Sequence, residues 1–314
     1  MRSRIQVLGI AISIVCLAGL VWWAARQPAP ELPDTAGQLW ALVGAILLYA
    51  LNTAVRSERW HALLREGGAR PRRSDTYALT VIGYTGNNVL PARAGDAVRV
   101  VLLAPRAETT MRTVIGTLLA ERLLDVAVVV VLFVVVGYAV LGEVSGGDVE
   151  LVAAITATGA LGAGLAFLLL RRNQRVLAFV QPLLRSTIGL GSGHGAAMLA
   201  ITCLIWMLEA GVWMAVGAAV DFGMNPLEGL YLVGLSSVFA LIPSGPGYAG
   251  TQDAAAAIGI KALGGSSSTA ISYILMLRFV LVVPITAAGL LLLAVRYGGI
   301  GELWRSRRPA VENA

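Results

Sequence analysis

Residues 87–99 read NNVLPARAGDAVR, and this stretch decides how the chain must be arranged. It lies between two apolar runs and interrupts them with proline, glycine, two asparagines and three charged side chains. A gap-free alignment places residues 90–97 (LPARAGDA) on residues 242–249 (IPSGPGYA), 152 positions later. Pro/Gly breaks at matching places in two halves of an apolar chain indicate broken helices around a shared site.

The composition indicates a polytopic membrane protein. Of the 314 residues, 57% are hydrophobic and 13% are charged, whereas ordinary soluble domains are about 25% charged. The net charge of +6 lies mainly in short loops, where positive charge orients membrane spans, so it does not indicate nucleic-acid binding. Cys16 and Cys203 lie in separate apolar runs, and His61 and His194 in distant loops, so we expect no metal, cofactor or disulfide.

The apolar runs predict an all-α protein with six full spans and two re-entrant helical hairpins. The hairpins are expected at 75–104, broken at 91–95, and at 227–262, broken at 243–247. Each arm is shorter than the ~20 residues that cross a bilayer, and broken backbone at that depth must be surrounded by protein or a wet cavity. The full spans are expected at 5–25, 37–55, 113–141, 150–170, 197–220 and 268–295.

The arginines support this topology. With two hairpins, the Arg-rich loops and both termini fall on one side, which is therefore the cytoplasm. Arg56 and Arg59 are assigned to one of these loops, the one after the second span. The opposite loops are mainly acidic, so we expect a multi-pass protein of a bacterial-type cytoplasmic (inner) membrane with cytoplasmic N- and C-termini.

The same topology predicts an inverted repeat within a single transmembrane domain, 1–314. A unit of span, hairpin and span occurs as repeat one, 37–141, and repeat two, 197–295. Three crossings separate the starts of the two units, so the second is inverted and the hairpin tips can meet near the midplane. Residues 1–25 are expected to be a signal-anchor span, too long and apolar for a cleaved signal peptide, and residues 296–314 a cytoplasmic tail.

The first hairpin carries Asn87, Asn88, Arg93, Asp96 and Arg99. Together they predict a cationic, amide-rich pocket for an anionic head group, because the planar guanidinium fork matches phosphate and stays charged. The alternative is structural. Asp96 would cap the second arm and pair with Arg99, while Arg93 extends toward the interface.

The third span carries Glu121 and Asp125 four residues apart, on one helical face. Two such carboxylates repel unless a cation lies between them or one is protonated. Arg93 or Arg99 is the natural cation. In the alternative interpretation, Glu121 and its neighbour Arg122 are ordinary residues at the membrane boundary.

Glu209 and Arg278 lie near the middle of the fifth and sixth spans. Each alone would be unfavourable there by at least ~2.5 kcal/mol. Either the two form a structural pair, or Arg278 faces substrate and Glu209 holds it in the ligand-free state.

The broken part of the second hairpin consists mainly of glycine and other small residues, which leave the main chain accessible. The candidate site residues of this hairpin are Ser244, Gly245, Gly247 and Asp253. Its glycines allow a ligand to approach the main chain. A helix that begins near Gly247 would direct N–H groups at the break, which favours an anion. Alternatively, the glycines only permit tight helix packing.

These motifs resemble the lysylphosphatidylglycerol synthase transmembrane region, a family of flippase-like integral membrane proteins. The resemblance covers nearly the whole chain and rests on residues 87–99, the ERLLD stretch 121–125, the PSGPG stretch 243–247, and Arg278. Asp96 and Asp253 stand where the family more often has glutamate, which keeps the charge. The tip at 244–250 is slightly longer than usual.

The resemblance implies movement of lipid across the membrane. In bifunctional members this region is thought to flip aminoacylated phosphatidylglycerol made by a C-terminal synthase domain, and some relatives are linked to polyprenyl-phosphate-linked sugars. This chain ends at Ala314, shortly after the last span. We therefore expect no synthase, no enzymatic activity, and a separate lipid-modifying enzyme as a partner.

Three functions remain open from the sequence. The first is flippase- or scramblase-like translocation of an anionic or phosphate-bearing lipid. The others are proton-coupled transport of a soluble anion, and a non-transporting scaffold for a cell-envelope enzyme. For lipid translocation, we assign phosphate contact to four arginines: Arg93, Arg99, Arg122 and Arg278. Four acidic residues would hold these arginines or carry coupling protons: Asp96, Glu121, Asp125 and Glu209.

Overall fold

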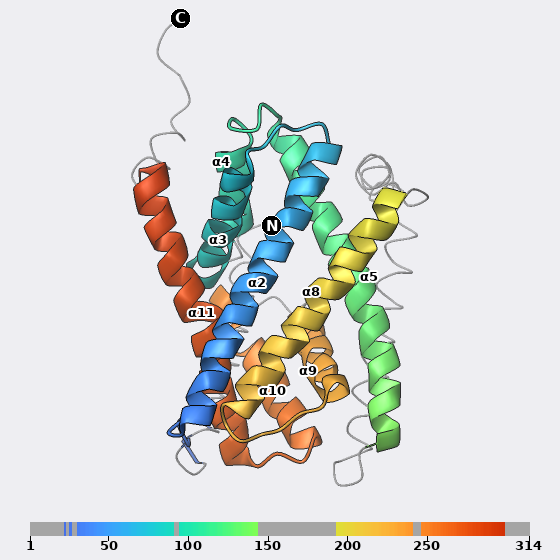
Figure 1. Ribbon diagram of the computed structural model, residues 1–314, viewed down its shortest axis with the longest axis vertical. Coiled ribbons are helices and arrows are strands. Elements are labelled where there is room, and N and C mark those ends of the chain that lie inside the picture. The colour runs from blue at the N-terminus through green and yellow to red at the C-terminus, as the bar shows by residue number, and fades with distance from the viewer. Residues whose placement is uncertain are drawn as a thin grey trace, which may run out of the picture.

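The computed structural model describes residues 30–90, 94–143, 193–240 and 246–298, together with residues 22, 25 and 26. Within those ranges the regular structure is entirely helical (Figure 1), as expected. The expected spans 5–25 and 150–170 lie outside the described residues. The long helices are α2 (Ala36–Glu66), α5 (Met111–Glu143), α8 (Gly193–Ala218) and α11 (Ser267–Tyr297). The short ones are α3 (Arg73–Val89), α4 (Gly95–Leu103), α9 (Pro226–Phe239), α10 (Thr251–Ala262) and the 3-10 turn η2 (Pro246–Tyr248).

Helix ends follow local signals in the sequence. Thr35 and Gln38 form a capping box at the start of α2, and Asn225 and Glu228 form another at the start of α9. α11 ends at Gly298, which has a φ of 69°, a left-handed conformation that glycine adopts without strain.

Three of the described helices, α2, α8 and α11, are long and apolar enough to cross a membrane. Large apolar side chains are exposed along α2 and α11, among them Trp40 (74%), Leu47 (64%), Leu291 (64%) and Val295 (79%). Such surface is unfavourable in water and suits contact with lipid tails. The protein is therefore a helical membrane protein.

The second helix is longer than the sequence predicted. The expected span ended at residue 55, but α2 continues to Glu66 and includes Arg56 and Arg59. Trp60, Leu63 and Leu64 are fully buried in this extension. The assignment of Arg56 and Arg59 to a loop is therefore wrong, because carboxylates on other helices neutralise both charges inside the protein.

The two interrupted stretches each form a pair of short helices. α3 packs against α4, and α9 packs against α10. In Figure 1, α3 and α4 occupy the upper part of the molecule, and α9 and α10 the lower part. Glycines allow the close approach of α3 and α4: a Cβ atom on Gly95 would lie 1.8 Å from the Gly83 carbonyl oxygen, and one on Gly86 would lie 2.6 Å from the Gly95 Cα.

The helix packing has a regular pattern. α3 packs against α11 as α9 packs against α5. α2 packs against α3 and α5 as α8 packs against α9 and α11, and α2 and α8 pack against each other. If α2, α3, α4 and α5 are exchanged in order with α8, α9, α10 and α11, these contacts map onto one another. η2 packs against both α3 and α10, so the two interrupted stretches touch.

Candidate functional site

A cluster of charges, most of them buried, joins four helices of the bundle. We call it the charge cluster, and it contains equal numbers of arginines and carboxylates. The members come from α2, α4, α5 and α8: Arg56, Arg59, Asp96, Arg99, Glu121, Arg122, Asp125 and Glu209.

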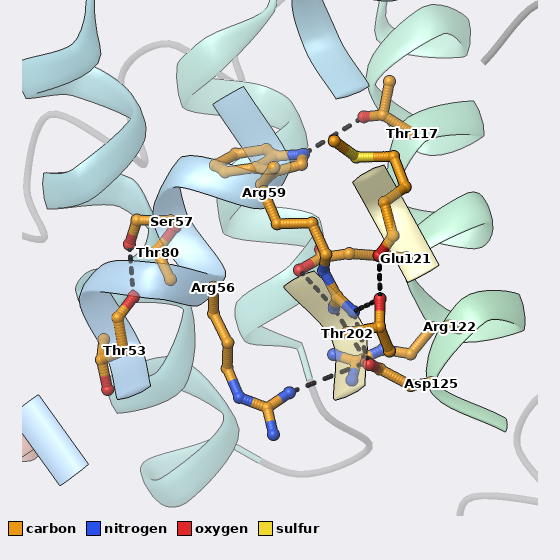
Figure 2. Close-up of polar contacts among 12 residues, drawn as sticks. Thr53, Arg56, Ser57, Arg59, Thr80, Thr117, Glu121, Arg122, Asp125 and Thr202 are labelled. Atoms are coloured by element: carbon orange, nitrogen blue, oxygen red, sulfur yellow. Dashed lines mark hydrogen bonds and ion pairs between the residues drawn. The ribbon is translucent and has the colours of Figure 1, made fainter. Parts of the chain in front are cut away.

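Arg59 lies at the centre of the charge cluster. Its Nη1 donates to Asp125 Oδ1 at 2.7 Å and its Nη2 to Asp125 Oδ2 at 3.1 Å, a bidentate arrangement. Nη2 also lies 3.3 Å from Glu121 Oε1, and Nη1 donates to the Thr202 hydroxyl at 2.9 Å. Figure 2 shows the Arg59 side chain pointing from α2 toward these groups on α5 and α8. The Arg59 side chain has no exposed surface.

The sequence predicted a cation between Glu121 and Asp125, and the structure supplies Arg59 in that role. The expected candidates were Arg93 and Arg99. Arg93 lies outside the described residues, and Arg99 forms an ion pair with Glu121 at 3.2 Å but none with Asp125. Glu121 is 3% exposed and lies between the guanidiniums of Arg59 and Arg99.

Arg99 and Asp96 connect the first hairpin to the rest of the charge cluster. The Arg99 guanidinium lies 3.8 Å from the centre of the Trp60 ring, a cation–π contact. Asp96 forms ion pairs with Arg99 at 3.5 Å and with Arg122 at 3.4 Å. The predicted pairing of Asp96 with Arg99 is therefore present, but α4 begins after Ala94 without a side-chain cap, so the predicted capping role is wrong.

Arg56 links Asp125 on α5 to Glu209 on α8, through contacts of 3.7 and 3.3 Å. Glu209 also accepts a hydrogen bond of 2.6 Å from the Asn52 side-chain amide. The predicted pair of Glu209 with Arg278 is therefore wrong. Although α8 packs against both α2 and α11, Glu209 contacts polar groups of α2.

Arg278 instead holds the broken segment of the second hairpin. Its Nε lies 2.5 Å from Asp253 Oδ1, and its terminal nitrogens donate to the carbonyl oxygens of Gly247 and Tyr248. The other Asp253 oxygen accepts the Gly250 N–H at 2.9 Å. Thus α10 begins at Thr251 rather than near Gly247, and the N–H of its N-cap residue, Gly250, donates to an internal carboxylate.

The broken segments meet beside Arg278. A Cβ atom on Gly247 would lie 3.7 Å from Asn88 Oδ1 and 3.5 Å from Arg278 Nη1, so Gly247 lies directly against both side chains. Gly247 has a φ of 61°, which glycine adopts readily. Asn88 also donates to the Thr286 hydroxyl on α11 at 3.2 Å. Asn87 is buried, and its Oδ1 has no hydrogen-bond partner among the described residues.

Exposure separates the arginines into two groups. The side chains of Arg59 and Arg99 are 0% and 1% exposed, whereas those of Arg122 and Arg278 are 43% and 24% exposed. The buried pair is neutralised by carboxylates and positions the helices. Arg122 and Arg278 retain surface that an anionic ligand can reach. Ser244 and Gly245 lie outside the described residues.

Sequence reasoning missed Asn52, Arg56 and Arg59 as members of the site. Asn52, Arg56 and Arg59 are separated by four and three residues, the spacing of one helical face. The apolar residues Trp60, Leu63 and Leu64 that follow continue the helical period past residue 55. That period was the available signal. In the residues that the structure describes, no group of histidine, cysteine and acidic side chains could hold a metal ion.

The fold and these contacts define a helical membrane protein with a neutralised, largely buried Arg–carboxylate cluster that includes residues of the first broken helical segment. The sequence matches the family described as Lysylphosphatidylglycerol synthase TM region over residues 6–289, so the chain belongs to this family. It is also 29% identical over 157 residues to Glycosyltransferase AglD of Haloferax volcanii, a match that covers 50% of this chain. The matched part is 24% of that relative's length. No solved structure matches the chain significantly.

Proposed function

We propose that this protein translocates anionic, phosphate-bearing lipids across the cytoplasmic membrane, in the manner of a flippase or scramblase. The observation that carries the proposal is the position of Arg278, a partly exposed guanidinium where the two broken segments meet. Arg122, the other partly exposed arginine of the candidate site, pairs with Asp96 of the first hairpin. A guanidinium binds phosphate through two parallel hydrogen bonds.

In this proposal the protein has six crossings and two re-entrant hairpins in an inverted repeat, with both termini in the cytoplasm. The exchange pattern of the helix contacts supports an internal two-fold relation. The placement of α3 and α4 in the upper part of the molecule and of α9 and α10 in the lower part supports entry from opposite leaflets (Figure 1). Broken helices at such an interface are where transporters of this kind place their substrate.

Two partly exposed Arg–carboxylate pairs, one in the charge cluster and one at the second hairpin, supply a mechanism for release. Arg122 and Arg278 each have a carboxylate partner, Asp96 and Asp253. A lipid phosphate replaces the carboxylate on one arginine, and the carboxylate returns when the phosphate leaves. The arginine is therefore never left as an isolated charge at membrane depth, where isolated charges are unfavourable.

We further propose that the chain itself carries no catalytic step and that a separate enzyme makes or uses the lipid. The name of the relative from Haloferax volcanii, a glycosyltransferase, supports an association of this kind of membrane region with transferase chemistry. The lipid would be an aminoacylated phospholipid or a polyprenyl-phosphate-linked sugar.

Reconstituted vesicles test the proposal. Full-length protein is placed in liposomes that contain fluorescent phosphatidylglycerol or phosphatidylcholine, and the fraction of label that an external reductant can reach is followed over time. We expect faster translocation of phosphatidylglycerol than in protein-free vesicles. Arg122→Ala and Arg278→Ala should each slow it by about tenfold or more, the loss of one charge-assisted hydrogen bond. Arg73→Gln, whose side chain is 70% exposed, is the matched control.

Two outcomes would replace the proposal. If no lipid moves but a pH gradient drives uptake of a soluble organic phosphate, the protein is a proton-coupled anion transporter. If neither moves, and both arginine variants leave growth and lipid composition unchanged in cells, the protein is a scaffold.

A further inference from the structure

A basic pocket lies away from the charge cluster, at the end of the molecule where α4 and α11 terminate. Its volume is about 700 Å³, within the usual range for ligand sites. The walls come from the last turn of α4, the segment between α4 and α5, and the last turn of α11. The lining contains two guanidiniums, Arg106 and Arg296, and no carboxylate.

Both guanidiniums are held in place by neighbouring groups. Arg106 lies 4.7 Å from the centre of the Tyr297 ring and donates one hydrogen bond, of 2.8 Å, to the Leu102 carbonyl. Arg296 donates to Ser74 Oγ at 2.8 Å and Asp75 Oδ1 at 3.0 Å, and the Tyr297 hydroxyl donates to the same Asp75 oxygen. A guanidinium has five N–H donors, so each retains donors for a ligand while its position is fixed.

The surroundings favour a lipid over a free anion. Val101, Pro105 and Met111 give the pocket an apolar wall, which would suit the glycerol and first acyl carbons of a lipid and not a hydrated ion. On α11, Val295 is 79% exposed and directly precedes Arg296. Exposed apolar surface thus gives way to the cationic lining at this end of α11, and lipid phosphates lie at the edge of a bilayer's apolar region. Basic pockets between membrane helices on the cytoplasmic side recognise anionic head groups.

We propose that this pocket, between Arg106 and Arg296, binds the phosphate of an anionic phospholipid in the leaflet at that end. At the corresponding end of the second hairpin, the described residues of α10 and of the turn from α10 to α11 carry a single cation, Lys261. The site is therefore one-sided and biases anionic lipid to one leaflet, beside the first hairpin. It depends on membrane insertion but not on translocation, so the two proposals can fail separately.

Native mass spectrometry of the full-length protein in detergent tests this site by equilibrium binding. The protein is incubated with phosphatidylglycerol or phosphatidylcholine, and retained lipid is counted. We expect retention of phosphatidylglycerol over phosphatidylcholine. Arg106→Gln should reduce it by about tenfold, the effect of one lost charge-assisted bond. Arg106→Lys should restore part of it, since lysine keeps the charge but not the fork.

Arg65→Gln is the matched control, because Arg65 is an exposed arginine at the same end and does not line the pocket. Arg296→Gln also removes the ion pair with Asp75, so its melting temperature is measured as well. The test of the proposal is therefore the retention of lipid by Arg106→Gln. Unchanged retention in Arg106→Gln, or an equal loss in Arg65→Gln, overturns the proposal. If millimolar inorganic phosphate displaces phosphatidylglycerol completely, the site is one for free phosphate and the lipid assignment is wrong.

Discussion

Arg59 and Asp125 form a bidentate ion pair in the interior of the helix bundle, through contacts of 2.7 and 3.1 Å. The Arg59 side chain is fully buried and that of Asp125 is 10% exposed. A buried pair adds little net stability over an apolar pair of the same shape, but the removal of one partner leaves an uncompensated charge. This relationship predicts how variants of the charge cluster will behave.

Arg59→Met should destabilise the protein strongly, because Asp125 and Glu121 then lose their shared cation. Loss of one partner of a buried pair costs about 3–5 kcal/mol, which thermal unfolding in detergent should reveal as a large fall in melting temperature. The double variant Arg59→Met with Asp125→Leu should recover most of this loss. Arg73→Gln, at an exposed pair with Glu58, should change stability by less than about 1 kcal/mol. A single variant as stable as the double variant would contradict the prediction.

The sequence predicted the broken segments better than it predicted the ion pairs. Pro91 and Pro243 interrupt apolar runs, and proline and glycine act through local backbone geometry. The ends of the helices on either side accordingly fell within a few residues of their expected positions. Partners of a charge are set by helix packing, which a single sequence does not specify. For this reason Glu209 was paired with Arg278, whereas the structure pairs it with Arg56.

The misplacement of Arg56 and Arg59 has a related cause. Arginines near the end of an apolar run are typical of a cytoplasmic loop. The same pattern arises when a helix continues and each arginine meets a carboxylate from another helix. Glu121 and Asp125 supplied those carboxylates, and the sequence showed that they needed a cation without showing which one.

Gly95→Ala should disrupt the first hairpin. The added Cβ would lie 1.8 Å from the Gly83 carbonyl oxygen and 2.6 Å from the Asn87 backbone nitrogen, so α3 and α4 must separate. Overpacking of this kind costs about 1–3 kcal/mol or more, and the shift would also move Asp96 and Arg99. The control is Gly44→Ala on α2, where nothing lies within 4 Å of the new Cβ. Equal melting temperatures of the two variants would show that the hairpin does not need this close contact.

Cysteine labelling should place the two ends of each hairpin on one side of the membrane. In a background with Cys16 and Cys203 replaced by serine, Arg70→Cys and Thr110→Cys flank the first hairpin. Both positions are exposed. A membrane-impermeant thiol reagent should modify both from the cytoplasmic side only.

For the second hairpin, Gly223→Cys and Lys261→Cys are exposed positions before α9 and near the end of α10. The same reagent should modify both from the outer side only. Modification of Arg70→Cys and Thr110→Cys from opposite sides would mean that 75–104 passes straight through the membrane, and the inverted repeat would be wrong.

Arg278→Lys should impair lipid translocation while the protein remains folded. The guanidinium of Arg278 contacts Asp253 and the carbonyls of Gly247 and Tyr248 together, and a single ammonium cannot reproduce that fork. We expect a fall of about tenfold or more in the translocation rate in vesicles, the effect of one lost charge-assisted hydrogen bond. The loss of stability should be smaller than for Arg59→Met, because the Arg278 side chain is 24% exposed and water can replace part of its contacts. If Arg278→Lys translocates lipid at the normal rate, the planar fork is not needed for phosphate, and a positive charge at this position is sufficient.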